Sequence, residues 1–402
     1  MKGSIWPRLL LLMILAPASA RAQPAFAARP SQTEKSQTKK MIDVGGYHLH
    51  FRVIAGRGTP ILFEAGGGDD GSVWDEIAEA VATITGAPVI TYDRAGFGKS
   101  EVSKNGHVGD HGIVAGVEGL EKALKALGYD GGIVLVGHSY GGLYTKLYAA
   151  RHADKVRYAV FVDSSSACWF DDAFFKEFRA GLAGDLQRLR AQGKLGQYYQ
   201  SANLARTIEV MRASAFPTNV PATDIVSEHP PFTNEDDVAR WRNCHREFAD
   251  AAPNREAITA YGTGHYIYRD NPALVVSAIV RGYAGTVAPA LRTGILERGM
   301  HYAMTAANDA SKREAAYRHS EADLNSWGYS LLSGNKLAAA LEVFRLNIDL
   351  HPDSWKAYDS YGEALLKAGR KAEAVAMYRK SVELNPDSAS GKAALGKLSN
   401  SE

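Results

Sequence analysis

Short apolar runs alternate with amphipathic stretches along most of the chain from Met41 onward. Short apolar runs bounded by turn residues are typical of buried strands, and apolar residues spaced three or four apart are typical of helices. We therefore expect strands and helices in turn, beginning with a hairpin over 42–53. Because the strands are apolar throughout, they predict a parallel sheet that helices cover on both faces. The expected strands are 60–64, 89–92, 133–136 and 156–162, and strand-like segments return at 222–226 and 256–261.

The alternation is interrupted between Ala167 and about Asn219, where the spacing of phenylalanine and leucine indicates helices instead. We interpret the stretch 167–219 as a helical cap inserted above the sheet. A later helix begins at Pro272, because proline fits the first turn of a helix. The sheet region is therefore expected to span 41–285 as an α/β domain, and a helical linker is expected over 286–320.

The C-terminal part of the chain repeats itself at a spacing of 34 residues. A 34-residue period with small, aromatic and proline residues at fixed places resembles the tetratricopeptide repeats, which are stacked pairs of helices. Only two repeats and a capping segment near 389–398 fit into 321–402, whereas about three repeats are needed for independent stability. We therefore expect this all-α module to dock onto the α/β domain, onto a second copy of the chain, or onto a protein partner. The matched pairs are Gly328 with Gly362, Leu331 with Leu365, Ala340 with Ala374, Phe344 with Tyr378, Pro352 with Pro386, Asp353 with Asp387 and Ser354 with Ser388.

The first 22 residues have the pattern of a secretory signal. Lys2 and Arg8 accompany an apolar stretch over 9–15, and small residues follow with cleavage options after Ala20 or Ala22. The apolar stretch is shorter than the roughly 20 residues that a membrane span requires. We expect cleavage and export to the periplasm or the medium, with no integral membrane span afterwards; an uncleaved anchor is the alternative. The polar tract 23–40 is expected to be a flexible leader.

Composition narrows the classes of function. The 402 residues include 46 lysines and arginines against 44 acidic residues, which gives a net charge of +2. Because the positive and negative charges nearly cancel, the net charge gives no electrostatic reason to expect nucleic-acid binding. The two cysteines, Cys168 and Cys244, are too few for a zinc site of their own; export permits one disulfide, and two buried thiols are the alternative. Because the sequence has no phosphate-binding loop, dinucleotide fingerprint or metal-ligand cluster, we expect no cofactor.

The clearest chemical signal is the run Gly-His-Ser-Tyr-Gly over 137–141, between an apolar strand and a helix. The pattern G-x-S-x-G is weak alone, but on a tight strand-to-helix turn it lifts Ser139 off the sheet edge as a nucleophile. Side chains at Gly137 or Gly141 are expected to collide with the adjoining backbone. The N-terminus of the following helix would stabilise a developing oxyanion.

Several motifs, in chain order, resemble those of the α/β-hydrolase fold. The resemblance covers about 240 residues and implies a serine-hydrolase triad in the order Ser, acid, His. Epoxide hydrolases and dehalogenases of this fold use a carboxylate as nucleophile. The resemblance therefore implies that Ser139, at the strand-to-helix turn, makes those two activities unfavoured for this chain. The motifs are Glu64-Ala65-Gly66-Gly67-Gly68 before Trp74, the run from Asp93 to Ser100, the elbow over 137–142, and Gly264-His265-Tyr266-Ile267 ahead of Asn271-Pro272.

His265 is the best candidate for the general base among twelve histidines. A serine needs a base because its hydroxyl is a poor nucleophile at neutral pH. His265 lies in a glycine-flanked loop after the last strand-like segment, late in the chain as the resemblance implies. His138 adjoins Ser139, but its side chain on the elbow is expected to point elsewhere. We interpret His245 and His301 as surface or packing residues.

The triad acid has several candidates. Asp163 ends the strand after the nucleophile helix, and a carboxylate there reaches the histidine in some members of the fold; capping of local N–H groups is its structural alternative. The commoner position follows the next strand, where the sequence offers Asp224 and Glu228 but lacks the usual G-x-x-D loop. We prefer Asp163, then Glu228, then Asp224, and we keep Asp236 and Asp237 as further options.

The resemblance also implies oxyanion donors, namely the backbone N–H groups of Tyr140 and of Gly67 or Gly68. We predict an exported serine hydrolase that cleaves a small-molecule carboxylic ester through an acyl-enzyme. The alternatives are an amidase or peptidase with the same triad, and a partner-binding protein with a vestigial hydrolase domain. Aromatic residues of the cap either line an acyl or alcohol site or form the cap's own core: Trp169, Phe170, Phe174, Phe175, Phe178, Tyr198 and Tyr199.

Overall fold

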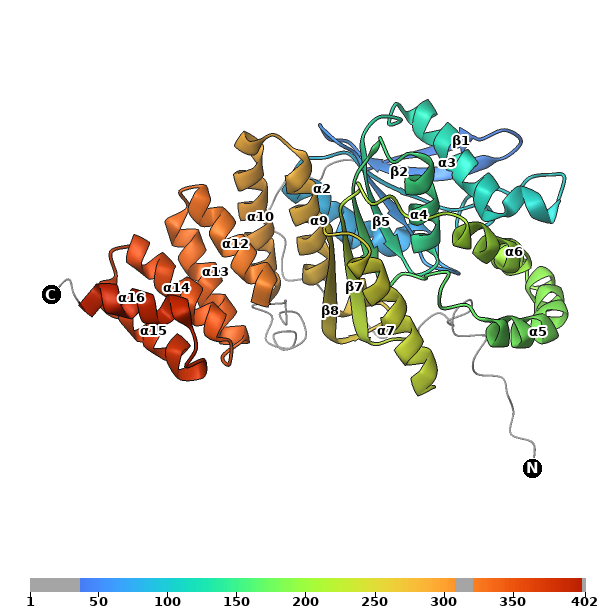
Figure 1. The fold of residues 1–402 in the computed structure, drawn as a ribbon. Coiled ribbons are helices and arrows are strands. Elements are labelled where there is room, and N and C mark those ends of the chain that lie inside the picture. The colour runs from blue at the N-terminus through green and yellow to red at the C-terminus, as the bar shows by residue number, and fades with distance from the viewer. Residues whose placement is uncertain (1–36, 308–320, 400–402) are drawn as a thin grey trace.

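A computed structural model describes residues 37–307 and 321–399 (Figure 1). The expected signal over 1–22, most of the expected leader and the segment 308–320 lie outside the described residues. The described strands form one eight-stranded sheet in the order β1-β2-β4-β3-β5-β6-β7-β8. Strands β3 to β8 run parallel to one another. Strands β1 and β2 form an antiparallel hairpin, and β2 pairs with β4 in antiparallel fashion. The strands are β1 Gln37–Asp43, β2 His48–Ile54, β3 Ile61–Glu64, β4 Val89–Tyr92, β5 Ile133–His138, β6 Val156–Val162, β7 Ala222–His229 and β8 Arg255–Gly264.

Strand β1 corrects one expected boundary, because it begins at Gln37 inside the tract expected to be a flexible leader. Its residues pair in register with β2, from Gln37 opposite Ile54 to Asp43 opposite His48. Most side chains of β1 are exposed, as befits the edge of the sheet. Polar residues and lysine are common on edge strands, so the composition of this segment resembled that of a linker.

Helices cover both faces of the sheet, which confirms the expected architecture (Figure 1). Strand β5 is apolar on both faces, with Val134 and Val136 in one core and Ile133 and Leu135 in the other. The first core includes α2 (Asp75–Thr85) and α9 (Pro272–Thr286), and the second includes α3 (Ile113–Leu127) and α4 (Gly141–Arg151). The short elements are η1 (Gly71–Trp74), η2 (Val108–His111) and α8 (Ile267–Asp270).

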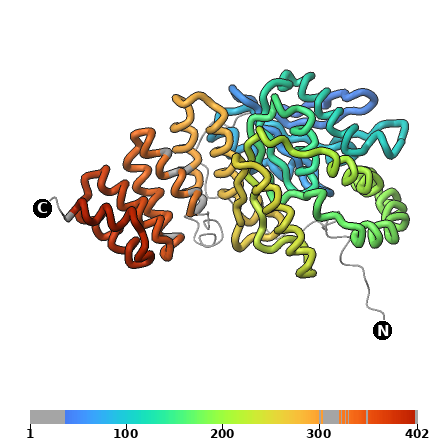
Figure 2. The backbone as a smooth tube through the Cα atoms, viewed as in Figure 1, coloured from blue at the N-terminus to red at the C-terminus, as the bar shows by residue number. Residues whose placement is uncertain are grey.

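The stretch expected to form a cap contains two long helices, α5 (Asp172–Ala191) and α6 (Leu195–Arg212). They lie between β6 and β7 in the chain and to one side of the sheet (Figure 2). A further helix, α7 (Glu235–Asp250), connects β7 to β8. In the described part of the chain, no helix combines the length and the apolar character that crossing a membrane requires.

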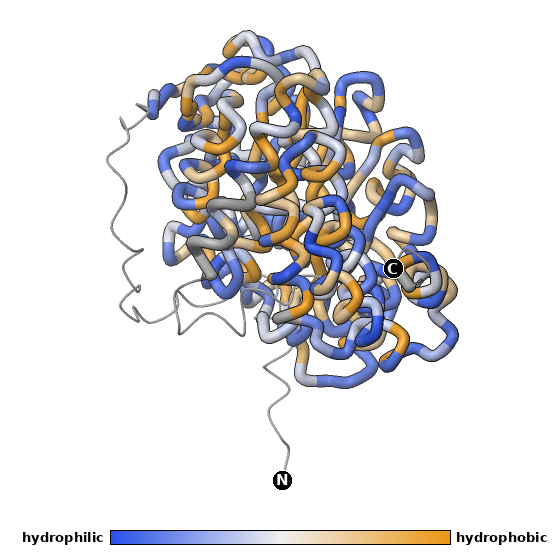
Figure 3. The backbone as a smooth tube through the Cα atoms, turned by 90° about the vertical axis from the view of Figure 1, so that its left-hand side faces the viewer, coloured by the Kyte–Doolittle hydropathy of each residue, from blue (hydrophilic) through white to orange (hydrophobic). Residues whose placement is uncertain are grey.

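The C-terminal region is all helical and continues away from the sheet as a stack (Figure 1). One apolar core runs from α9 through α10 into α12 and α13, so the region packs against the sheet part rather than standing free. In the chain as a whole, hydrophobic positions lie mostly toward the inside and hydrophilic ones mostly on the outer turns (Figure 3). The helices are α10 Pro289–Ala307, α12 Glu321–Ser333, α13 Leu337–Leu350, α14 Trp355–Lys367, α15 Lys371–Leu384 and α16 Ala389–Ser399.

Equivalent positions of the 34-residue period make equivalent contacts. A β-carbon at Gly328 would lie 2.4 Å from the Phe344 ring, and one at Gly362 would lie 3.1 Å from the Tyr378 ring. In each helix pair, therefore, a glycine lets an aromatic residue of the second helix approach the first. The period thus reflects a repeated packing arrangement.

Candidate active site

Ser139 lies in the turn between β5 and α4, and its φ of 50° is in the left-handed region that non-glycine residues rarely adopt. The expected collision with backbone is confirmed at Gly141, whereas at Gly137 the collision is with a side chain. A β-carbon at Gly141 would lie 2.4 Å from the carbonyl oxygen of Ala65, and one at Gly137 would lie 2.4 Å from Thr145 Oγ1. At Gly137 the nearest obstacle is therefore a side chain, and the backbone comes next at 3.1 Å.

The structure brings Ser139, His265 and Asp163 together at the carboxyl ends of three strands. Ser139 follows β5, Asp163 follows β6 and His265 follows β8. The Ser139 hydroxyl lies 2.9 Å from His265 Nε2, and His265 Nδ1 lies 2.7 Å from Asp163 Oδ2. All three residues are buried, with 3%, 7% and 0% of their surface exposed respectively. This is the arrangement of a nucleophile, a base and an orienting acid.

Asp163 is held by more than the histidine. Its Oδ2 accepts a hydrogen bond from Ser227 Oγ at 2.8 Å, and its Oδ1 accepts from the Ser227 N–H at 3.0 Å and from Trp241 Nε1 at 3.1 Å. Burial alone would raise the pKa of this carboxyl. The hydrogen bond and charge of His265, the charge of His245 and the hydrogen bond from the Ser227 N–H together lower that pKa to about 2. Asp163 is therefore ionised at neutral pH and suited to stabilise an imidazolium.

The other candidate acids have different partners. Asp224 lies within β7, and its Oδ2 is 2.6 Å from His245 Nδ1. Glu228 accepts a hydrogen bond from the Gly262 N–H at 2.7 Å. We interpreted His245 as a surface or packing residue; it is buried and therefore a packing residue.

The remaining acids lie in the first turn of α7. The N–H groups of Asp236 and Asp237 donate to Asn234 Oδ1, and the Asp237 carboxylate pairs with Arg240 at 2.7 Å. Within the described residues, Asp163 is the carboxylate that contacts His265. Our order of preference placed Asp163 first.

His138 is a neighbour of the site whose contribution the sequence reading missed. Its Nε2–H donates to the backbone carbonyl of His265 at 3.0 Å, whereas the ring that bonds the Ser139 hydroxyl is that of His265. The two imidazole rings lie 4.7 Å apart. Burial and the proximity of His265 hold the pKa of His138 well below its usual range. His138 therefore stays neutral and fixes the backbone that carries His265.

Trp241 and Ser227 were also missed as partners of Asp163. Trp241 lies on α7, where Trp241, Cys244 and His245 share the buried face of the helix. Their spacing of three and four residues is the helical signal that could have identified this face. Ser227 lies near the end of β7, where a triad acid is more usual, and supplies a hydroxyl and an N–H to Asp163 instead.

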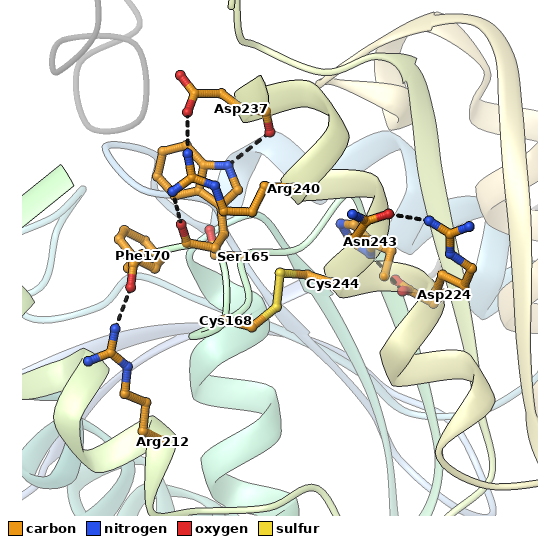
Figure 4. Close-up of a disulfide and its surroundings, with 12 residues drawn as sticks. Ser165, Cys168, Phe170, Arg212, Asp224, Asp237, Arg240, Asn243 and Cys244 are labelled. Carbon is orange, nitrogen blue, oxygen red and sulfur yellow. Dashed lines mark hydrogen bonds and ion pairs between the residues drawn. A yellow bond between two sulfur atoms is a disulfide. The ribbon is translucent and has the colours of Figure 1, made fainter. Parts of the chain in front are cut away.

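A disulfide fixes α7 against the segment that follows β6. Cys168 and Cys244 are bonded, with their Cα atoms 6.0 Å apart (Figure 4). On the same helix, Arg240 donates to the Trp169 carbonyl at 3.3 Å and pairs with Asp171. The disulfide alternative of the sequence reading is therefore the one observed, and it places Trp241 beside Asp163.

The candidate oxyanion donors lie on two segments that pack closely. Because Gly141 approaches the carbonyls of Glu64 and Ala65, the first turn of α4 lies against the end of β3. Tyr140 is at that first turn, where helical N–H groups lack intrahelical acceptors. Gly67 and Gly68 follow β3 directly, and Gly68 has a φ of 86° that favours glycine. A carbonyl oxygen over Ser139 would lie near both segments.

The aromatic residues near the cap form mainly a packed cluster. Trp169 stacks on Phe232 with ring centroids 4.7 Å apart, and Phe174 stacks on Phe178 at 5.8 Å. Tyr199 differs, because it packs on His111 at 4.1 Å and lines a small cavity between α6 and the end of β4. Across residues 37–307 and 321–399, no three His, Cys, Asp or Glu side chains are grouped as metal ligands.

Two curated proteins are similar to part of this chain. The chain is 26% identical over 248 residues to the uncharacterized protein YqjL of Bacillus subtilis (strain 168), covering 61% of this chain and 90% of that protein. It is 26% identical over 175 residues to a proline iminopeptidase of Lactobacillus delbrueckii subsp. lactis, covering 41% of this chain and 59% of that protein.

Among solved structures, the chain resembles an enol-lactonase from Burkholderia xenovorans LB400. The sequences are 19% identical, the match covers 61% of this chain and 99% of the lactonase, and the TM-score is 0.43. The family model of the alpha/beta hydrolase fold matches residues 59–279, which is more than half of the chain. The chain therefore belongs to the alpha/beta hydrolase fold family.

Proposed function

We propose that the protein is an exported serine hydrolase that cleaves a carboxylic ester through an acyl-enzyme. The observation that carries the proposal is the continuous hydrogen-bonded chain from the Ser139 hydroxyl through His265 to Asp163, with distances of 2.9 and 2.7 Å. A serine alone is a weak nucleophile, and a neutral imidazole held at its hydroxyl is what makes it reactive.

The reaction follows from the contacts of each group. As Ser139 Oγ attacks the ester carbonyl, its proton passes to His265 Nε2, and Asp163 stabilises the imidazolium through Nδ1. The tetrahedral intermediate then expels the alcohol, which takes the proton from Nε2. Water attacks the acyl-enzyme with His265 again as base, and the carboxylic acid leaves. Backbone N–H groups of Tyr140 and of Gly67 or Gly68 would receive the oxyanion, and no cofactor enters these steps.

Covalent labelling tests the proposal. An organophosphonate probe should modify the purified native protein at Ser139 and leave Ser139→Ala unmodified. Ser277→Ala is the matched control, because Ser277 is also a buried serine but lies on α9; it should label like the native protein. If the native protein is not labelled, the alternative of a partner-binding protein with a vestigial hydrolase domain is favoured.

Amide or peptide cleavage is the second candidate. The match to a proline iminopeptidase, although it spans 59% of that protein, favours it. The triad would be the same, and the shape of the pocket decides between the two bond types. A panel of acyl esters and of amides and peptides with a free N-terminus, tested on the native protein and on Ser139→Ala, separates them. Faster turnover of the peptides would replace the ester proposal.

For the C-terminal region we propose stacked tetratricopeptide-like repeats that bind a protein partner or a second copy of the chain. The equivalent contacts of Gly328 with Phe344 and of Gly362 with Tyr378 support this proposal. Sedimentation over a range of concentrations would detect self-association. Export is proposed from residues 1–22 and is tested by fractionating cells that express the chain with and without them.

A further inference from the structure

Arg94 follows β4 and connects the segments that carry the candidate oxyanion donors. Its guanidinium donates from Nη1 to the carbonyl of Ala65 and from Nη2 to the carbonyl of Gly66, both at 2.5 Å. The residue is only 5% exposed. A charged, forked donor in a buried place makes stronger hydrogen bonds than a neutral donor. The glycine loop after β3 is therefore held at two successive peptide groups.

These two hydrogen bonds set the direction of a backbone N–H group. The Gly66 carbonyl and the Gly67 N–H belong to one planar peptide unit, and in a trans peptide they point in opposite directions. The described part of the chain contains no cis peptide. When Arg94 holds the Gly66 carbonyl, the Gly67 N–H must face away from the guanidinium. Gly67 itself does not fix this direction, because glycine has little steric preference in its backbone torsion angles.

The same guanidinium packs against the second donor segment. Its central carbon lies 5.8 Å from the centre of the Tyr140 ring and 5.2 Å from that of Tyr144, both in contact range for a cation and an aromatic ring. Tyr140 is the residue after Ser139, and its N–H is the other candidate oxyanion donor. Arg94 thus contacts both sides of the expected oxyanion hole.

Arg94 is itself paired with Glu64, which is in turn bonded by Tyr92 of the neighbouring strand. Glu64 Oε2 lies 3.6 Å from Arg94 Nη1, and Glu64 Oε1 accepts a hydrogen bond from the Tyr92 hydroxyl at 2.6 Å. Glu64 ends β3 and Tyr92 ends β4, so the sheet itself fixes this network. A lysine ammonium carries its donors on a single nitrogen and lacks the planar fork that lets two guanidinium nitrogens bond the two carbonyls side by side.

We propose that Arg94 is a positioning residue that preorganises the oxyanion hole, by fixing the peptide groups of the glycine loop and by supporting Tyr140. The proposal rests on the proposed function, since it concerns the transition state of the same reaction. Donors aimed in advance at the developing charge accelerate acyl transfer, and losing one such donor slows it by about 100- to 1,000-fold. Arg94 itself touches no reacting atom in this account.

The test compares Arg94→Met with Arg255→Met. Arg255 is a matched control because it also donates to backbone carbonyls, those of Phe248 and Phe216, and packs over their rings. It lies at the start of β8, at the other end of that strand from His265. We expect Arg94→Met to lower kcat for an activated ester by about 100-fold, with KM changed less than threefold, and Arg255→Met to keep kcat within threefold.

A second readout reports on the oxyanion hole directly. An alkyl boronic acid that forms a tetrahedral adduct with Ser139 should lose affinity in Arg94→Met in parallel with kcat, while the carboxylic acid product should bind as it does to the native protein. Equal losses of kcat in Arg94→Met and Arg255→Met, or unchanged boronic acid affinity, would overturn the proposal.

Arg94→Lys covers the case in which Arg94→Met does not fold. The lysine keeps the charge but not the planar fork that fixes both carbonyls, so we expect kcat to fall about tenfold. A folded Arg94→Lys protein with native kcat would overturn the proposal. If the native protein itself neither turns over esters or amides nor accepts the organophosphonate, the proposed function has failed instead, which is a different outcome.

Discussion

Two buried aspartate–histidine pairs lie close together in this molecule, and only one of them reaches a serine. Asp163 and His265 are 2.7 Å apart, and Asp224 and His245 are 2.6 Å apart. Nε2 of His265 bonds the Ser139 hydroxyl, whereas Nε2 of His245 has no hydrogen-bond partner in the part of the chain that the structure describes.

An aspartate–histidine pair alone is therefore not enough for catalysis; the histidine must also reach a nucleophile. Asp224 lies inside β7 and His245 on the buried face of α7, so their contact holds a helix to the sheet. Asp163 and His265 follow their strands, at the sheet edge where the elbow presents Ser139. The pairs also interact, because the charge of His245 helps to lower the pKa of Asp163. One pair is therefore expected to serve catalysis, and the other stability.

The largest effect should come from breaking each pair in turn. Asp163→Asn should lower kcat about 10,000-fold, because an asparagine no longer holds the imidazole in the tautomer that accepts the serine proton. Asp224→Asn should leave kcat within about tenfold but lower the free energy of unfolding by about 2 kcal/mol, since it weakens a buried hydrogen bond to His245. Steady-state kinetics and urea unfolding of both variants are the measurements.

Glu228→Gln serves as the control for the other candidate acid. Glu228 contacts the Gly262 N–H rather than His265, so its variant should keep native kcat. A loss of activity confined to Glu228→Gln, or shared equally by Asp163→Asn and Asp224→Asn, would contradict the assignment of the two pairs.

The next effect concerns α7, which carries a partner of each pair. The disulfide from Cys168 to Cys244 joins residues 76 positions apart. Replacing both cysteines by serine should lower the free energy of unfolding by about 2–4 kcal/mol. Because Ser227 would still hold Asp163, we expect kcat to fall less than tenfold. Denaturant unfolding of the double variant tests this, and unchanged stability would show that the bridge is dispensable.

Acid unfolding tests whether Asp163 is ionised in the folded protein. The pKa of Asp163 is lowered from 3.8 to about 2 in the folded protein, so its ionised form stabilises the fold above about pH 4. That contribution, about 2 kcal/mol, is lost as the pH falls through 2. Asp163→Asn should therefore lose less stability than the native protein between pH 5 and pH 2. Parallel losses would mean that Asp163 is not the group that titrates.

The smallest effect should come from Trp241, which donates to Asp163 from α7. Trp241→Phe removes one of several hydrogen bonds to the carboxylate while keeping an aromatic ring, so kcat should fall about tenfold. Trp355→Phe, in the C-terminal helical region, is the control and should keep native kcat. An activity of Trp241→Phe equal to that of the control would show that this bond does not orient the acid.

Much of the fold was readable from the sequence because local patterns determine it. The apolar runs of β3 to β6 need burial on both faces, and the glycines around Ser139 fit a turn in which a β-carbon would collide. The position of His265 followed from the chain order implied by the family resemblance. The start of β1 was missed because an exposed edge strand has the composition of a linker.

The acid could be ranked but not fixed from the sequence, because its partner depends on how strands and α7 pack. Asp163 and Asp224 are both buried aspartates, each bonded to a different buried histidine, and nothing in the local sequence says which histidine each one contacts. Likewise, the Arg94 contact with Gly66 joins two loops that only the sheet order β4-β3-β5 makes neighbours.

An acyl-enzyme mechanism requires that Ser139 carry an acyl group during turnover. Rapid acid quenching of the native protein with a slowly hydrolysed ester, followed by peptide mass spectrometry, should show one acyl group on the peptide that contains Ser139, and none in Ser139→Ala. Turnover without an acylated Ser139, or acylation at another residue that persists in Ser139→Ala, would contradict it.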